Sequence, residues 1–240
     1  MISKNKIIIN NKWLYSEDKD KDFITVNLPH SNKEVPYNYF DEKSYQFISY
    51  YKKNLNIEAD ENKRVFLNFE GVMTAFKLYI NGKEIGEYKG GYIPHFIEIT
   101  NYVDFKEENE VLVEVDSTER EDIPPFGAVV DYLTFGGIYR DVFLYYLNKC
   151  FIKNILYKYE VTDINNGKGK IKITPKVLIN NELSSENYQL NFYVKNITKS
   201  ISIDLIEGEK WYEIESFDIG EVDLWSIENP NIYTANCKLI

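Results

Sequence analysis

Hydrolysis through a serine or cysteine nucleophile needs a base, and the sequence offers only His30 and His95 for that role. Neither histidine lies near a G-x-S-x-G turn, because the sequence contains no such turn. The G-x-G-x-x-G and phosphate-loop patterns of nucleotide sites are also missing from the sequence. We therefore predict that both histidines are structural and that the chain has no catalytic triad.

Paired carboxylates are a second source of hydrolytic chemistry, and the chain has 38 Asp and Glu residues. Glycosidases place two carboxylates on either side of the bond that they cleave. At this acidic content, however, neighbours such as Asp41-Glu42 and Glu121-Asp122 are expected by chance. We interpret these pairs as solubilising surface residues and assign no general acid.

Sugar recognition is a third chemistry, since aromatic rings can stack on a sugar while carboxylates accept hydrogen bonds from its hydroxyls. Asp131 is followed closely by Tyr132 and Phe135, with Phe126 and Tyr139 on either side. This composition predicts a substrate-binding loop in which Asp131, Tyr132 and Phe135 contact the sugar. The alternative is that the aromatic residues belong to the core of a β-structure.

The first half of the chain, which contains this loop, has the pattern of short β-strands. Apolar and β-prone runs occur at residues 65–69, 75–80, 84–88, 96–99, 111–115 and 138–146. Asn81-Gly82 predicts a tight hairpin, because both residues tolerate positive φ. Val111, Val113 and Val115 are predicted to share one face of a strand. The stretch from Asp116 to Phe135 lacks strand character, and loops of this length are usually functional or mobile.

The second half continues with six candidate strands separated by turn residues. They cover residues 151–160, 170–179, 188–197, 201–206, 211–219 and 232–239. Short strands at nearly regular spacing are typical of an immunoglobulin-like sandwich, which has about seven strands. The last candidate reaches the end of the sequence, so we expect a sandwich truncated at its last strand and a longer natural protein.

Charge and cysteine content narrow the classes of partner and compartment. The formal net charge is −10 and the isoelectric point is about 4.9, which disfavours nucleic acids and anionic membranes. The only cysteines, Cys150 and Cys237, form no metal-binding pattern and are expected to be reduced thiols. No apolar run approaches the length of a membrane span. We predict a cytoplasmic protein without a metal site in these residues.

Several ordered motifs resemble glycoside hydrolase family 2, which includes β-galactosidases, β-glucuronidases and β-mannosidases. The most specific are Gly136-Gly137-Ile138-Tyr139-Arg140-Asp141-Val142 and the stretch from Leu224 to Tyr233, which reads LWSIENPNIY. Further matches are the LPH element at residues 28–30, the YYKK strand at 50–53, and the segments 78–86, 90–100 and 109–116. Together these motifs cover nearly the whole chain in the order of the family.

The resemblance implies an all-β fold: a jelly-roll, galactose-binding-like sandwich at residues 1–148, followed by an immunoglobulin-like sandwich at 149–240. It also implies that the catalytic glutamates lie on a TIM barrel that is missing here, so that these residues include no catalytic group. The aspartate upstream of the GGIYRDV run contacts a substrate hydroxyl or a sodium ion in the family, and by position it is Asp131. A second contact, an asparagine, falls near Tyr37-Asn38-Tyr39.

The implied function is that of a non-catalytic part of a β-galactosidase that uses a retaining, two-carboxylate mechanism. A β-glucuronidase or β-mannosidase parent and a free-standing carbohydrate-binding module on a spacer are the alternatives. No cofactor is expected in these residues, whereas the parent enzyme would use sodium or magnesium. The expected partners are a carbohydrate shared with the barrel and further copies of the chain in a homo-oligomer.

Overall fold

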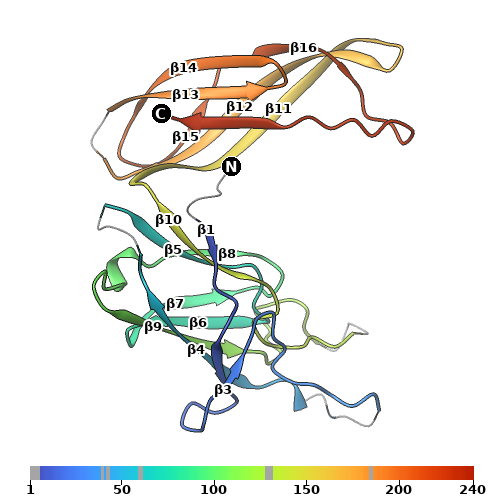
Figure 1. The fold of residues 1–240 in the computed structure, drawn as a ribbon. Helices are drawn as coiled ribbons and strands as arrows, with labels where there is room; N and C mark the ends of the chain where they lie inside the picture. Colours follow the sequence, from blue (N-terminus) through green and yellow to red (C-terminus); the bar gives the residue numbers. More distant parts are fainter. Residues whose placement is uncertain (1–5, 39–40, 42–43, 59–61, 128–131, 184–185) are drawn as a thin grey trace. The chain divides into compact units, whose positions relative to one another are not determined.

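The computed structural model describes all 240 residues except 1–5, 39–40, 42–43, 59–61, 128–131 and 184–185. Among the described residues, its regular elements are β-strands and a short 3₁₀ helix at Thr100–Tyr102, so the predicted all-β class is confirmed. The chain divides into two compact units, Met1–Leu147 and Asn148–Ile240 (Figure 1). The domain border predicted from the sequence, between residues 148 and 149, lies one residue further along the chain.

The first unit consists of two antiparallel sheets. One sheet has six strands in the order β3-β2-β4-β9-β6-β7, and the other has four in the order β1-β10-β5-β8. The strands are β1 (Lys6–Ile8), β2 (Trp13–Ser16), β3 (Ile24–Val26), β4 (Ile48–Asn56), β5 (Arg64–Phe69), β6 (Ala75–Ile80), β7 (Lys83–Lys89), β8 (His95–Glu98), β9 (Glu108–Asp116) and β10 (Val142–Leu147).

Local sequence explains the hairpin between β6 and β7 and the buried face of β9. Asn81 and Gly82 connect β6 to β7 with φ values of 51° and 76°, which confirms the predicted turn. Val111, Val113 and Val115 on β9 are all fully buried, as their alternation predicts. Side chains from both sheets form one core that includes Trp13, Tyr51, Leu67, Phe69, Phe76, Leu78, Val113 and Leu144.

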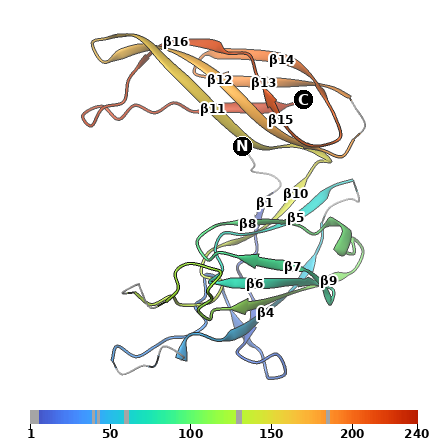
Figure 2. The same ribbon diagram turned by 180° about the vertical axis from the view of Figure 1, so that it is seen from behind.

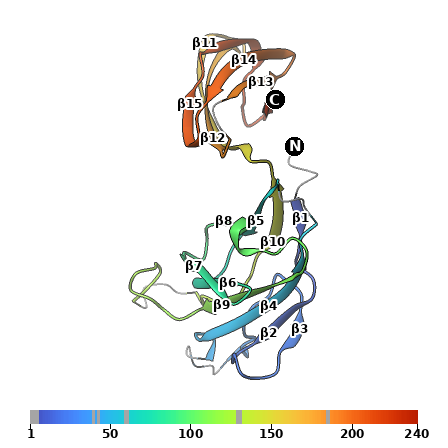
Figure 3. The same ribbon diagram turned by 90° about the vertical axis from the view of Figure 1, so that its left-hand side faces the viewer.

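The second unit also has two antiparallel sheets, which face each other in Figure 3. One sheet contains β11-β12-β15, with β16 also paired to β12, and the other has the order β14-β13-β17. The strands are β11 (Cys150–Asn165), β12 (Lys168–Asn181), β13 (Glu186–Val194), β14 (Ile197–Leu205), β15 (Gly208–Glu213), β16 (Phe217–Asp223) and β17 (Ala235–Leu239). Between the sheets lie Val177, Ile179, Leu190, Phe192 and Leu205.

One prediction for this unit is wrong, because residues 211–219 form parts of two strands instead of one. β15 pairs with Lys176–Asn181 of β12, whereas β16 pairs with Lys168–Ile173. The Pro175 carbonyl accepts a hydrogen bond from the Ile214 N–H at 3.0 Å, so the backbone nitrogen of Pro175 faces the same side. Since proline has no N–H, the ladder is interrupted there. The unit therefore has seven strands where the sequence predicts six.

Membrane crossing by a helix finds no support in the described ranges. No helix there is both long enough and apolar enough to cross a bilayer.

Candidate substrate-binding face

The predicted sugar-binding residues belong to the long connection between β9 and β10. Asp131 lies outside the described residues, so its position is not part of the geometry below. Tyr132 is 52% exposed, whereas Phe135 is half-buried. The first unit thus presents one of the two described aromatic residues to solvent and packs the other partly inside.

The end of this connection is held by the segment that follows β3. The His30 N–H donates to the Ile138 carbonyl at 2.8 Å, and the Asn32 N–H donates to the Gly136 carbonyl at 2.9 Å. Asn32 also donates from Nδ2 to the Ser117 hydroxyl at 2.9 Å, and its carbonyl accepts from the Tyr15 hydroxyl at 2.7 Å. The two backbone bonds join segments about a hundred residues apart in sequence and fix where the loop returns to the sheet.

Gly136 and Gly137 are required by this close approach. A Cβ on Gly136 would lie 2.1 Å from the Ser117 Cβ, and one on Gly137 would lie 2.5 Å from the His30 carbonyl oxygen. Gly137 also has a φ of +116°, which residues with a side chain rarely adopt. The glycine pair of the GGIYRDV run therefore lets two backbone segments pass each other beneath the loop.

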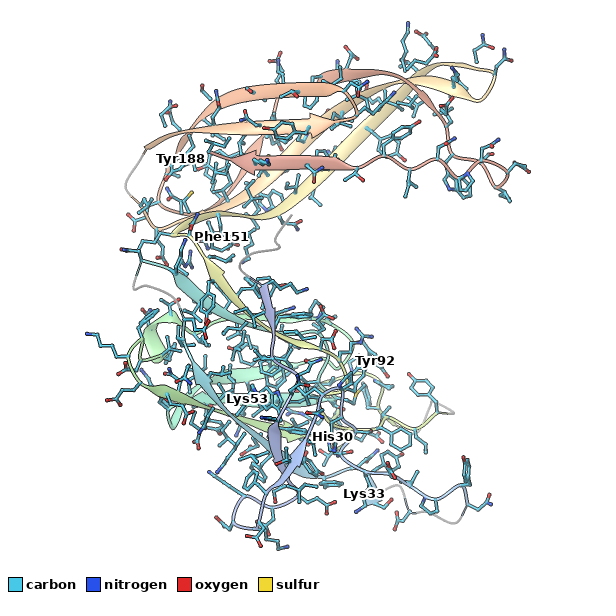
Figure 4. The ribbon with its side chains drawn as sticks, viewed as in Figure 1. His30, Lys33, Lys53, Tyr92, Phe151 and Tyr188 are labelled. Atoms are coloured by element: carbon cyan, nitrogen blue, oxygen red, sulfur yellow. The ribbon has the colours of Figure 1, made fainter. Side chains whose placement is uncertain are left out.

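His30 lies in an aromatic cluster below the same loop, and Figure 4 labels it together with Lys33 and Tyr92. Its Nδ1 is 2.9 Å from the Tyr51 hydroxyl, and its ring is 4.7 Å from that of Tyr15. Burial lowers the pKa of His30 and raises the pKa of Tyr51. The His95 ring nitrogen Nε2 lies 3.2 Å from the Gly90 carbonyl. Both histidines thus contact groups of the first unit's own fold.

Phe135 and the segment from Ser31 to Tyr37 line one cavity of about 420 Å³. Phe135 packs against Tyr45 with a ring distance of 5.5 Å, and Tyr37 is fully exposed at the rim. Residues near Tyr37, where the second substrate contact is predicted, therefore share this cavity with a residue of the long loop. The Asn32 Oδ1 atom, buried beside it, has no hydrogen-bond partner among the described residues.

Tyr132 meets a residue that sequence reasoning did not assign to the site, Tyr92. Burial and a hydrogen bond with Tyr132 raise the pKa of Tyr92 to about 12. Nearby, the Tyr139 hydroxyl donates to the Gly91 carbonyl, and Arg140 Nη1 lies 3.4 Å and 3.5 Å from the carbonyls of Glu70 and Tyr92. Tyr92 and Tyr132 form an exposed aromatic pair whose backbone is anchored by the GGIYRDV run.

Comparison with known proteins assigns the first unit. The family model described as "Glycosyl hydrolases family 2, sugar binding domain" matches residues 3–148. This chain belongs to glycoside hydrolase family 2. The match ends at the border between the two units, while the curated relatives below cover both.

Family 2 relatives include enzymes with two different names. A β-galactosidase of Thermoanaerobacterium thermosulfurigenes is 41% identical, over 95% of this chain and 34% of the relative. A β-glucuronidase of Bacteroides fragilis is 32% identical, over 98% and 35%. A solved β-glucuronidase of Bacteroides uniformis matches the fold with a TM-score of 0.78 at 22% identity, over 98% of this chain and 30% of its own. The chain spans about a third of the length of these proteins.

Asp122, which lies early in the long loop of this family 2 domain, forms ion pairs with Arg120 and Lys89. Arg120 bonds to Asp122 and Glu87 at 3.0 Å and 2.8 Å, and Lys89 Nζ lies 2.6 Å from Asp122. The hydrogen bond from Arg120, together with one from Lys89, lowers the pKa of Asp122. Carboxylates held ionised in this way cannot act as general acids at neutral pH. This cluster therefore offers no proton donor.

The adjacent Arg140 and Asp141 contact different parts of the first unit. Asp141 accepts a hydrogen bond from Asn10 at 2.7 Å, which ties it to the start of the chain. Arg140 instead approaches the backbone carbonyls of Glu70 and Tyr92. In the described residues, no group of three or more His, Cys, Asp or Glu side chains could hold a metal ion.

Proposed function

We propose that this chain is the non-catalytic N-terminal region of a β-galactosidase that hydrolyses terminal β-galactosides. The observation that carries the proposal is the 41% identity to a relative named β-galactosidase over 95% of the chain. Because that relative is about three times as long, the cleaving residues are placed in the remainder of the protein. There, two carboxylates would act by a retaining mechanism.

The role proposed for the first unit is to shape the sugar site from outside the catalytic domain. Asp131 would accept a hydrogen bond from a sugar hydroxyl, and Tyr132 and Phe135 would offer ring faces beside it. Support comes from the exposed pair of Tyr92 and Tyr132 and from the cavity that Phe135 shares with the Tyr37 segment. The backbone bonds from His30 to Ile138 and from Asn32 to Gly136 fix the end of the loop, and such preorganisation would lower the entropic cost of binding.

Hydrolysis of nitrophenyl glycosides by the full-length protein tests the substrate assignment. We expect kcat/KM for the β-galactoside to exceed that for the β-glucuronide and β-mannoside by at least about 100-fold, since a site built for one hydroxyl pattern rejects another. The 240-residue chain alone, as the control, should hydrolyse none of them. Faster cleavage of the glucuronide or mannoside would reject the galactosidase proposal.

A β-glucuronidase is the second candidate, because a relative of that name is 32% identical over nearly the whole chain. A free-standing carbohydrate-binding module is a third, favoured by the exposed aromatic pair. Calorimetric titration of the 240-residue chain with galactose and glucuronate separates the module from the shared site. Millimolar or tighter binding by the chain alone would favour the module, and the absence of heat would favour a site completed elsewhere.

Compartment, assembly and cofactors follow as further proposals. Cys150 and Cys237 are thiols that form no disulfide, which fits a reducing compartment, so we place the protein in the cytoplasm. Homo-oligomerisation of the full-length enzyme is expected, with light scattering as its test. A sodium or magnesium requirement of the parent enzyme is expected too, and dialysis against a chelator or a sodium-free buffer would reveal it as lost activity.

A further inference from the structure

Five charged side chains meet where the long loop leaves β9. They come from β7, from the end of β9 and from the loop: Glu87, Lys89, Asp116, Arg120 and Asp122. In this ion cluster each cation contacts at least two carboxylates, so the five charges form one network. A network with good geometry restrains a surface segment, whereas an isolated exposed pair contributes little.

The six-stranded sheet explains why these charges lie together. β7, β6 and β9 are neighbours in it, and Figure 2 shows the long loop, in yellow-green, at the end of these strands. Lys89 on β7 and Asp116 on β9 both pair with Ala75 of β6. Glu87 shares a face of β7 with Lys89, because alternate residues of a strand point to the same side. The strand register therefore places three of the five charges, and the loop adds the other two.

Arg120 is the centre of the ion cluster. Its Nε and Nη2 atoms donate to the two carboxylate oxygens of Asp122 at 3.0 Å and 3.1 Å, which is the two-pronged geometry that suits a guanidinium. Its Nη1 atom donates to Glu87 at 2.8 Å and lies 3.5 Å from an oxygen of Asp116. Arg120 thus joins the loop both to β7 and to the end of β9.

The first described part of the loop is folded around Arg120. The Arg120 carbonyl accepts a hydrogen bond from the Ile123 N–H at 3.2 Å, and the Ile123 side chain is buried. Further along, the Glu119 carboxylate accepts a hydrogen bond from the Gly127 N–H. This part of the loop is therefore tied to itself by local bonds, while the ion cluster ties it to the sheet.

The aromatic pair of Tyr92 and Tyr132 lies on the same two segments as the ion cluster. Tyr92 follows Lys89 by three residues, which span at most about 10 Å of chain. Tyr132 lies on the loop that carries Arg120. The two tyrosines are 47% and 52% exposed, and one hydrogen bond at the surface contributes too little to hold two segments in register. The pair therefore needs a second contact between the segments, which the ion cluster supplies.

We infer that Arg120 is a positioning residue for carbohydrate binding, which holds the long loop against β7 through the ion cluster so that Tyr132 meets Tyr92. Because its guanidinium is directed at carboxylates of the fold, Arg120 acts through the loop and not by contact with the sugar. The effect on sugar binding rests on the proposed function of the loop, whereas the positioning of the two tyrosines does not.

Salt is the condition that loosens the ion cluster. Hydrogen bonds from Arg120 lower the pKa of Asp122 and the pKa of Glu87, so both carboxylates stay ionised in mildly acidic buffer. Their side chains are 46% and 35% exposed, and dissolved ions therefore reach them and screen the attraction. Sugar affinity should fall as ionic strength rises.

Steady-state kinetics of the full-length enzyme test the inference, with whichever glycoside the unsubstituted enzyme cleaves best. We expect Arg120→Gln to raise KM by about fivefold or more and to change kcat by less than about twofold, the pattern of lost binding and unchanged chemistry. Arg120→Lys, which keeps the charge but not the paired geometry, should recover part of the loss. An unchanged KM, or a loss confined to kcat, would overturn the inference. Since any cleaved glycoside serves, a wrong galactosidase assignment leaves the test valid.

A matched pair of lysines and a salt series give the controls. Lys89→Gln removes a 2.6 Å pair with Asp122, and Lys153→Gln removes a similarly exposed 2.6 Å pair with Glu209 in the second unit. We expect a KM increase of about twofold or more for Lys89→Gln and none for Lys153→Gln. Potassium chloride raised from about 0.05 M to about 1 M should increase the KM of the unsubstituted enzyme but not that of Arg120→Gln. Equal salt responses of these two enzymes would overturn the inference, because salt would then act at another site.

The pKa of Tyr92 reports the aromatic pair directly in the 240-residue chain, without any catalysis. Tyrosine-labelled NMR should show this pKa falling from about 12 in Arg120→Gln, toward the ordinary value of about 10. The inference requires both changes. A lower Tyr92 pKa with an unchanged KM, or a higher KM with an unchanged Tyr92 pKa, would overturn it.

Discussion

Gly137 combines a φ of +116° with a backbone that passes directly beneath the proposed sugar-binding loop. An added methyl group would meet the His30 carbonyl at 2.5 Å and the Tyr51 hydroxyl at 2.8 Å. Because Tyr51 is fully buried, these atoms cannot move aside easily. Because Gly137 has no Cβ, the buried groups around it do not clash, and the backbone can follow the path that places the end of the loop.

Gly137→Ala is therefore expected to lower the free energy of unfolding by about 2–4 kcal/mol, through both strain and overpacking. Urea denaturation measures the change. Gly82→Ala is the control, since Gly82 also has positive φ, at 76°, but nothing lies within 4 Å of its Cβ position. That variant should lose only about 1–2 kcal/mol. Equal losses for both variants would show that the close approach adds nothing.

The hydrogen bond between Tyr92 and Tyr132 gives a prediction that titration can check. Burial contributes most to the raised Tyr92 pKa of about 12, and the bond to Tyr132 raises it further. Tyr132→Phe removes this bond, so the Tyr92 pKa should fall toward the ordinary value of about 10. Tyrosine-labelled NMR across alkaline pH follows it, with Tyr146, whose hydroxyl accepts from the Glu58 N–H, as reference. An unchanged Tyr92 pKa would show that the two hydroxyls do not interact.

Sequence reasoning identified the loop from Asp131 to Phe135 but left Tyr92 unassigned. Tyr92 follows Gly90-Gly91 on another connection, 40 residues before Tyr132, and only the folded chain brings the two together. The acceptors that Arg140 approaches are backbone carbonyls, which carry no signal in sequence. Local motifs therefore predict which segment is a candidate for binding, whereas the residues that contact this segment are set by tertiary packing.

Adjacent strands β5 and β8 are joined by an ion pair that is largely shielded from water. Arg64 donates to Glu98 from Nε at 2.9 Å and from Nη2 at 2.6 Å, and the Arg64 side chain is 6% exposed. Burial alone would raise the pKa of Glu98, but hydrogen bonds from Arg64 and Thr100 lower it overall. The charged form of Glu98 is thus favoured in the folded state.

Since the folded pKa of Glu98 is depressed, its stabilisation is present above the unfolded pKa of about 4.3 and is lost as pH falls through the folded value. Glu98→Gln should cost about 1–3 kcal/mol at neutral pH, because it removes the carboxylate that accepts two charge-assisted hydrogen bonds from Arg64. The difference from the unsubstituted chain should shrink below about pH 4. Urea midpoints at several pH values measure it, and a difference independent of pH would contradict the role of the carboxylate.

Elements with a strong local signal were predicted well from sequence. The Asn81-Gly82 and Asn166-Gly167 turns close hairpins, with positive φ at all four residues. The break between β15 and β16 was missed, because its cause lies on the partner strand β12, where Pro175 offers no N–H. The composition of a segment predicts whether that segment forms a strand, whereas the hydrogen-bond ladder also depends on the residues of the partner strand.

For the whole molecule, we propose that this chain contributes to sugar binding and that a region outside these 240 residues cleaves the substrate. The family match to residues 3–148 supports the first assignment, and the length of the relatives supports the second. Sequence motifs were sufficient to predict the family and the all-β class. The identity of the sugar could not be predicted, because the residues proposed to select it lie mainly outside these 240.

The most direct test of the central claim is the kinetics of Asp131→Ala in the full-length enzyme with a β-galactoside. We expect kcat/KM to fall by about 100-fold or more, the effect of losing a charged hydrogen bond to the substrate in a closed site. Glu121→Ala, which removes an exposed carboxylate from the same loop, serves as the control and should leave kcat/KM unchanged. Equal kinetics for Asp131→Ala and the unsubstituted enzyme would contradict the claim that this loop contributes to the sugar site.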